Sequence, residues 1–253
     1  MGKNKLTKFA EMEQLRNVFQ PPHEEVFRTD YRLKGRWREL VFGNEHPIVL
    51  EVGCGKGEYT VGLAEQCSEK NFIGLDIKGA RMWSGAKQAQ ERGLQNVAFL
   101  RTHAEELESV FGPGEIDEIW ITFPDPQMAK ARKRLTGTCF LHRYQHILTP
   151  NGRIHLKTDS PFLYRYTQEV IRVNQLPLWV ETDNLYASDY RHTTPNIQTF
   201  YEQQWLSRGK SIKYLQFSLG ENPSLAEPTI ELEKDDYHSE ARFMSKPITP
   251  KRR

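Results

Sequence analysis

Short apolar runs alternate with helix-like segments through the middle of this 253-residue chain. The first run, residues 48–52, is followed by glycines and then by Tyr59 and Leu63, which share one helix face. Comparable runs, each suited to a buried strand, occur at residues 72–76, 97–100, 119–123 and 154–158. Because parallel strands need helical crossover connections, this alternation predicts an α/β fold, with a mostly parallel central sheet and helices on both faces.

The rest of the chain divides around this alternating region. Residues 1–45 show no clear strand pattern and are broken by Pro21-Pro22, so we predict an N-terminal basic arm that packs against the core or reaches beyond it. Residues 46–220 form the predicted α/β domain, and residues 221–253 a C-terminal tail without regular structure. Within the domain, further helices are predicted at 80–86, 140–147, 161–173 and 199–208, and further strands at 178–181 and 212–217.

Composition excludes several classes of protein. No apolar run approaches the roughly 18 residues of a membrane span, and no apolar core or cleavage site follows Met1. We therefore expect no membrane association, no secretory signal and a cytoplasmic location. The three cysteines are widely spaced and odd in number, which disfavours a disulfide framework and a Cys-rich zinc site. The net charge is only +2, yet a polyanion partner is permitted by basic clusters at residues 3–8, 130–134 and 251–253.

A glycine-rich loop, Glu51-Val-Gly-Cys-Gly-Lys-Gly57, follows the first strand and precedes a helix. Glycines at this position let the backbone approach a ligand closely, so a nucleotide-like cofactor is expected beside Gly53 and Gly55. The spacing lacks the Gly-Lys-Ser/Thr of a phosphate-binding P-loop, and the third glycine comes one position too early for a dinucleotide fingerprint. An acid followed by Gly-x-Gly-x-Gly resembles the first motif of Rossmann-like methyltransferases, in which Glu51 would accept from the ammonium group of the ligand.

Two further acids lie at the carboxyl ends of predicted strands. Asp76 ends the second strand, where an acceptor can take both ribose hydroxyls of a nucleotide. Phe123-Pro-Asp-Pro126 follows the fourth strand, and ligands of open parallel sheets bind outside the carboxyl ends of the strands. The two prolines hold Asp125 in place, so this carboxylate is expected to face the reacting group.

Six motifs occur in the order found in one enzyme family. They are Glu51-x-Gly-x-Gly-Lys-Gly57, Asn71-Phe-Ile-Gly-Leu-Asp76, Phe123-Pro-Asp-Pro126, the basic run to Arg134-Leu-Thr136, His155-Leu-Lys-Thr-Asp159 and Thr199-Phe-Tyr-Glu202. This set, which spans about residues 45–217, resembles the bacterial tRNA (guanine-N7)-methyltransferase (TrmB) family. The resemblance implies a Rossmann-like S-adenosylmethionine-dependent methyltransferase fold, with residues 46–220 as the methyltransferase domain. It also implies methyl transfer from S-adenosylmethionine to N7 of a guanine in the variable loop of tRNA.

The same resemblance implies roles for particular residues. The cofactor site would be lined by Glu51, Asp76, His103 and Asp125, beside the two glycines of the loop. Asp125 would also be the catalytic residue. The tRNA would be met by Lys130, Asp159, Thr199 and Glu202, the last three of them at the target guanine.

The chain departs from the family at two places. Family members usually have Asp where His103 stands, which affects the contact with adenine. They also have Pro-Asp-Pro-Trp and a Lys/Arg/His-rich stretch where this chain has residues 127–135. The substrate lysine of the family falls nearest Ala129 or Lys130, and only Lys130 can pair with a phosphate. A solvated run of charges is the alternative interpretation of this segment.

The implied chemistry needs no nucleophilic residue and no metal. Guanine N7 carries a lone pair and no proton, so direct attack on the sulfonium methyl requires in-line positioning rather than a strong base. Asp125 would stabilise the positive charge that develops on the base. His142 and His146 are four residues apart, but Arg143 stands where a zinc motif has Glu, so we expect no metal site.

Two other functions remain open from the sequence. One is methylation of an exocyclic amino group, although such enzymes favour Asn/Asp-Pro-Pro-aromatic over Phe123-Pro-Asp-Pro126. The other is a tRNA-binding protein that kept the fold but lost turnover, which the changed loop after Asp125 suggests. The sequence also leaves open whether the protein is a monomer or a homodimer.

Overall fold

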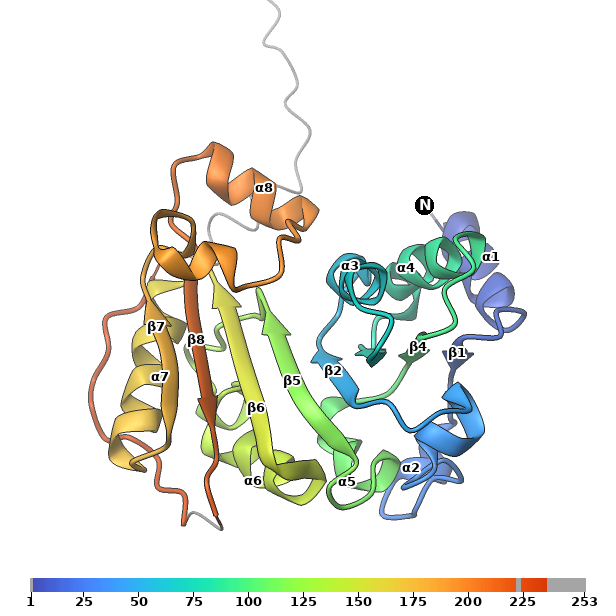
Figure 1. Cartoon of the computed structure of the whole chain (residues 1–253), viewed down its shortest axis with the longest axis horizontal. Helices are drawn as coiled ribbons and strands as arrows, with labels where there is room; N and C mark the ends of the chain where they lie inside the picture. Colours follow the sequence, from blue (N-terminus) through green and yellow to red (C-terminus); the bar gives the residue numbers. More distant parts are fainter. Residues whose placement is uncertain (1, 222–223, 236–253) are drawn as a thin grey trace, which may run out of the picture.

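The computed structural model describes residues 2–221 and 224–235 and contains an eight-stranded sheet (Figure 1). The strand order is β1-β4-β3-β2-β5-β6-β8-β7. All neighbouring strands between β1 and β6 in this order are parallel. At the other edge, β8 runs antiparallel to both of its neighbours, β6 and β7. The strands are β1 (Val18–Phe19), β2 (Ile48–Val52), β3 (Asn71–Leu75), β4 (Val97–Leu100), β5 (Ile116–Thr122), β6 (Leu148–Thr158), β7 (Leu178–Thr182) and β8 (Lys213–Ser218). The predicted mostly parallel sheet is confirmed.

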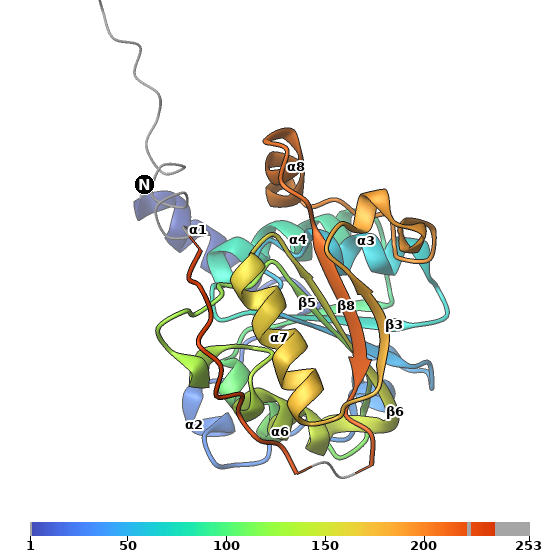
Figure 2. The ribbon, with the colours of Figure 1, turned by 90° about the vertical axis from the view of Figure 1, so that its left-hand side faces the viewer.

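Helices cover both faces of the sheet (Figures 1 and 2). One face carries α1 (Gly2–Met12), α3 (Glu58–Gln66) and α4 (Gly79–Glu91). The other carries α5 (Leu107–Val110), α6 (Thr138–Ile147) and α7 (Pro161–Val173). Two short helices lie outside these layers, α2 (His23–Val26) and, above the carboxyl ends of β5 and β6, α8 (Phe200–Ser207). No helix in the described part of the chain is long and apolar enough to cross a membrane.

The burial of the β2 side chains explains why this run does not alternate between apolar and polar residues. Ile48, Leu50 and Val52 pack into the hydrophobic cluster beneath α5, α6 and α7, whereas Val49 packs into the cluster beneath α3 and α4. A strand covered by helices on both faces buries every side chain, so it loses the alternation of an exposed strand. Glu51 interrupts this run and is also buried, with 2% of its surface exposed.

The N-terminal segment contributes directly to the sheet and the core. Val18 and Phe19 pair in parallel with Phe99 and Leu100 of β4. Trp37 is fully buried, and its indole N–H donates to the Val110 carbonyl oxygen (2.8 Å). A two-residue strand is too short to show a period in the sequence, which is why none is predicted there.

The C-terminal segment returns along α7 (Figure 2). Residues 224–235 form neither helix nor strand, and the Glu227 carboxylate accepts from the Thr138 hydroxyl (2.7 Å) and from the Tyr166 hydroxyl. Residue 1, residues 222–223 and residues 236–253 lie outside the described residues, as do the side chains of residues 2–4. The basic cluster at 251–253 and most of the predicted tail are therefore not described, and the division into arm, domain and tail stays a prediction.

Candidate active site

A cavity of about 810 Å³ opens at the carboxyl ends of the central parallel strands. Its volume lies within the range of about 300–1,000 Å³ that is usual for small-molecule sites. The glycine loop forms one wall, the segments that follow β3, β4 and β5 form others, and Thr199, Tyr201 and Trp205 border it from α8 and its N-terminal cap. All six predicted cofactor residues border it, namely Glu51, Gly53, Gly55, Asp76, His103 and Asp125.

Glu51 lies at the buried end of this cavity. Its Oε2 accepts from the backbone N–H of Thr60 (2.9 Å) and from the Thr60 hydroxyl, and its Oε1 accepts from the Thr122 hydroxyl (2.6 Å). Burial raises the pKa of Glu51 to about 7, although these hydrogen bonds oppose the shift. The Glu51 carboxyl group therefore titrates near neutral pH. A cation bound at this end of the cavity would favour its ionised form.

Asp76 fixes the glycine loop. Its Oδ2 accepts from the Gly55 N–H (2.9 Å), and its Oδ1 accepts from the Lys78 N–H (2.7 Å). A carboxylate has about four acceptor positions, so both oxygens keep capacity for a ligand hydroxyl. At Gly57, φ is +74° and a Cβ would lie 2.5 Å from the Phe99 ring, so only glycine fits where the loop enters α3.

Asp125 stands at the exposed rim, in a loop with unusual backbone angles. Its Oδ1 accepts from the Gln127 N–H (2.9 Å), which closes a tight turn. Phe123 and Gln127 on either side have φ values of +48° and +47°, in the left-handed region that residues other than glycine rarely adopt. Strained backbone of this kind concentrates at functional sites, where it aims a side chain.

His103 and Thr199 border the same cavity from different elements. His103 is exposed and precedes a short 3-10 helix, Ala104–Glu106, that follows β4. Thr199 caps α8, and its hydroxyl accepts from the Glu202 N–H (3.2 Å). Both residues therefore lie at the cavity, and their contacts with a ligand stay predictions.

The other three predicted substrate residues do not border the cavity. Lys130 is exposed on the loop after Asp125, and the nearby Lys133 borders the cavity instead. Asp159 follows β6 and is 4% exposed, and burial raises its pKa to about 6. Within the described residues its Oδ1 has no hydrogen-bond partner. Their contacts with tRNA stay predictions.

Glu202 forms an ion pair with Lys157 in the interior. The Lys157 Nζ lies 2.8 Å from Oε1 and 3.1 Å from Oε2 of Glu202, and both side chains are fully buried. The Tyr186 hydroxyl also donates to Glu202 Oε1 (2.6 Å), and Lys157 donates to the Ile197 carbonyl oxygen (3.3 Å). Burial lowers the pKa of Lys157, and the Glu202 charge opposes this shift. The pair ties β6 to α8, so it sets where α8 stands over the cavity.

Sequence reasoning gave Lys157 no role of its own, although a signal was present. A lysine inside an otherwise buried strand must find a partner, because an unpaired buried charge is strongly unfavourable. The sequence does not identify that partner, since Glu202 is 45 positions away.

The basic run after Asp125 divides into two kinds of residue. Lys130, Arg132 and Lys133 are exposed, whereas Arg134 is 9% exposed. The Arg134 guanidinium donates to the carbonyl oxygens of Gln127 (3.3 Å) and Met128 (2.9 Å) and lies 4.3 Å from the Tyr166 ring centroid. Arg134 therefore supports the Asp125 loop from inside, and the exposed three remain as candidate phosphate contacts.

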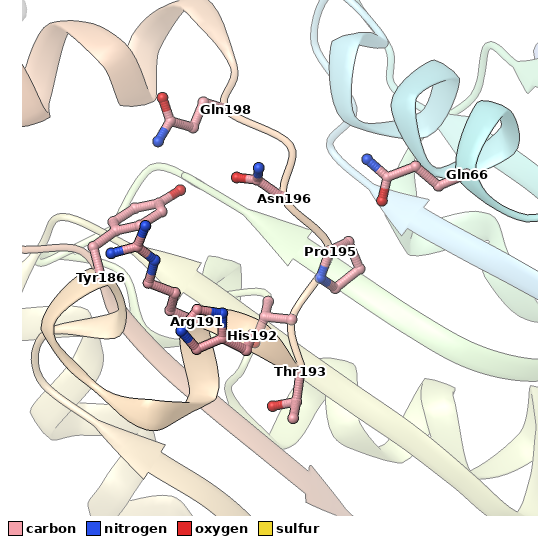
Figure 3. Close-up of a pocket in the computed structure, with 9 residues that line it drawn as sticks. Gln66, Tyr186, Arg191, His192, Thr193, Pro195, Asn196 and Gln198 are labelled. Carbon is pink, nitrogen blue, oxygen red and sulfur yellow. The ribbon is translucent and has the colours of Figure 1, made fainter.

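A second hollow of about 560 Å³ lies between the end of α3 and residues 186–198 (Figure 3). Figure 3 shows Gln66 on α3 across from the segment that carries Asn196 and Gln198. Its other lining residues are Tyr186, Arg191, His192, Thr193, Thr194 and Pro195. None of the predicted site residues borders this hollow, so the larger cavity is the candidate active site.

Comparison with known proteins identifies the family. A family model described as "Putative methyltransferase" matches residues 45–215. The tRNA (guanine-N(7)-)-methyltransferase of Bacteroides thetaiotaomicron is 53% identical over 239 residues, which cover 94% of this chain and 95% of that protein. The enzyme of the same name from Porphyromonas gingivalis is 53% identical over 243 residues, covering 94% of this chain and all of that protein. This chain belongs to the tRNA (guanine-N7)-methyltransferase family. The resemblance seen in the sequence motifs is thus confirmed.

Solved structures support the fold assignment for this family member. The crystal structure of the 16S rRNA methyltransferase KamB matches with a TM-score of 0.55 at 16% identity, covering 72% of this chain and 92% of that one. At this identity the match shows the fold alone, and it confirms the predicted Rossmann-like methyltransferase fold. In the part of the chain that the structure describes, no group of three or more His, Cys, Asp or Glu side chains is arranged to hold a metal ion.

Proposed function

We propose that this protein transfers a methyl group from S-adenosylmethionine to N7 of a guanine in the variable loop of tRNA, in the cytoplasm. One observation carries the proposal. In a chain that is 53% identical to tRNA (guanine-N(7)-)-methyltransferases, a single cavity gathers the acid of β2, the glycine loop, Asp76 and Asp125. S-adenosylmethionine supplies the reactive methyl group when it is bound.

The cofactor residues have separate tasks in this proposal. Glu51 accepts from the ammonium group of the amino-acid end, since it is the buried carboxyl group of the cavity. Gly53 and Gly55 let the backbone pass close to the ligand, and Asp76 accepts from the ribose hydroxyls. His103, which follows β4, borders the adenine end.

Asp125 acts at the reacting end. Its carboxylate is held at the rim by the Gln127 N–H, where it stabilises the positive charge that guanine acquires as N7 is methylated. No proton leaves N7, so Asp125 works electrostatically. Lys130 is proposed to pair with a tRNA phosphate, as its exposure permits.

Asp159, Thr199 and Glu202 are proposed to hold the guanine. Thr199 borders the cavity. Asp159 is buried and does not border it, and its Oδ1, which has no hydrogen-bond partner among the described residues, could accept from the N1-H and N2 amino donors of guanine if the base reaches it. Direct contact by Glu202 requires its ion pair with Lys157 to open, so its proposed role includes holding α8 in place.

The test is methyl transfer from labelled S-adenosylmethionine to unmodified tRNA, followed by nucleoside analysis and N7-specific chain cleavage. N7-methylguanosine is the expected product. A different methylated nucleoside would overturn the substrate assignment. Binding of tRNA and cofactor with no methylated product would favour a protein that has lost turnover.

The proposed role of Glu51 predicts that cofactor affinity depends on pH. The bound ammonium favours the carboxylate, so below the Glu51 pKa of about 7 binding must first displace a proton. We expect the dissociation constant for S-adenosylmethionine to rise by up to about tenfold for each pH unit below about 7. Just above this pH the dissociation constant should change little. Calorimetry at about pH 6 and pH 7.5, in two buffers of different ionisation heat, measures both the affinity and the released proton.

The matched control is Glu51→Gln, which keeps acceptor and donor groups near Thr60 and Thr122 but does not titrate. Its affinity should be lower and independent of pH over the same range. Equal wild-type affinities at the two pH values, with no proton release, would refute the assigned role of Glu51.

A further inference from the structure

We propose that Phe200 and Tyr201, in the first turn of α8, form a stacking platform for tRNA bases at the mouth of the active-site cavity. The platform rests on the proposed function, because it describes how the RNA substrate is held at the same site. Tyr201 stacks on the target guanine, and Phe200 stacks on a neighbouring base of the same strand.

The two aromatic side chains are exposed although α8 packs against the protein. Phe200 is 49% exposed and Tyr201 is 41% exposed, while Glu202 and Trp205 of the same helix are buried. The two ring centroids are 5.9 Å apart and the ring planes meet at 73°. Contiguous exposed apolar surface marks interaction sites, and these two rings are adjacent in space. The packing of α8 does not account for them.

The position of the pair indicates which partner it is. Tyr201 borders the cavity that Glu51 and Asp125 also border, whereas Phe200 does not border it. In Figure 1, α8 stands above the carboxyl ends of β5 and β6, where the reacting base must enter. A base that reaches Asp125 therefore passes Tyr201, and the next base of the strand lies outside, at Phe200.

The platform is held in place, and the ion pair of Lys56 with Glu58 (Nζ to Oε1, 3.8 Å) lies beside it. The Phe200 N–H donates to Glu58 Oε2 (2.9 Å), which joins the start of α8 to the start of α3. The Lys56 Nζ lies 4.4 Å from the Phe200 ring centroid and 5.8 Å from the Tyr201 ring centroid. Fixed aromatic rings beside a lysine are what proteins use to bind single-stranded RNA, since the rings stack on bases and the cation attracts phosphates.

The test compares leucine variants, which keep an apolar side chain but lose the flat ring. We expect Phe200→Leu and Tyr201→Leu each to weaken binding of an unmodified tRNA transcript by about 10- to 100-fold, as measured by fluorescence anisotropy with S-adenosylhomocysteine present. In methylation assays Phe200→Leu should raise KM for tRNA alone, whereas Tyr201→Leu should raise KM and lower kcat. The ring-retaining variants Phe200→Tyr and Tyr201→Phe should restore most of the affinity.

Phe27→Leu is the matched control, because Phe27 is 47% exposed but follows α2, at the opposite end of the molecule from α8 (Figure 1). Its tRNA affinity should equal that of the wild type. Unchanged affinity in both test variants would overturn the platform. An equal loss of S-adenosylmethionine affinity in Tyr201→Leu would also overturn it, by placing Tyr201 in the cofactor site. A wild-type protein that binds the transcript without forming N7-methylguanosine would refute the proposed function, while the affinity ratios still decide the platform.

Discussion

Replacing Asp125 by Asn is expected to lower kcat for tRNA methylation by about 100- to 1,000-fold, the usual effect of removing one group that stabilises transition-state charge. Asn keeps an oxygen that can accept from the Gln127 N–H, so the loop should keep its shape while the negative charge is lost. Single-turnover methyl transfer at saturating cofactor and tRNA measures the effect on the chemical step.

Glu105→Gln is the control for Asp125→Asn. Glu105 is an exposed acid that borders the same cavity but follows β4 rather than β5. Removing its charge should change kcat little, because it is not in the Phe123-Pro-Asp-Pro126 loop that is proposed to act at the reacting base. Similar rates for wild type and Asp125→Asn would show that the Asp125 charge is not catalytic.

Replacing Lys157 by Met is expected to destabilise the protein by about 3–5 kcal/mol, because it leaves the buried Glu202 carboxylate without its counter-charge. In a chain of this size that loss lowers Tm by about 6–20 °C. Thermal unfolding followed by circular dichroism measures it. Because the ion pair connects β6 to α8, tRNA affinity should fall together with stability.

The double variant Lys157→Met/Glu202→Gln separates the cost of an unpaired buried charge from the cost of losing the ion pair itself. Gln at 202 is neutral and keeps an acceptor for the Tyr186 hydroxyl, so much of the lost stability should return. The additional loss seen in Lys157→Met alone is the cost of the unpaired charge. Equal Tm values for wild type and Lys157→Met would contradict the view that the pair holds α8.

The sequence alone determined the central alternating architecture and the cofactor half of the candidate site, but not α1, β1 or α2. Its signals are local: apolar runs mark strands buried on both faces, and the glycines of 51–57 follow the first of them directly. In a parallel sheet the carboxyl ends of neighbouring strands meet at one edge. Glu51 is the penultimate residue of β2, and Asp76 and Asp125 follow β3 and β5, so their convergence on one cavity follows from the pattern.

Tertiary structure alone decided the substrate half. Glu202 follows the cavity residue Tyr201 in the sequence, but its side chain points inward and pairs with Lys157. Arg134 belongs to the same basic run as the exposed Lys130, Arg132 and Lys133, but its side chain is buried and supports the Asp125 loop. No local sequence pattern predicts either arrangement, because each depends on which groups the fold brings together from distant elements. A buried charge must be paired, but the chain does not state locally which partner will reach it.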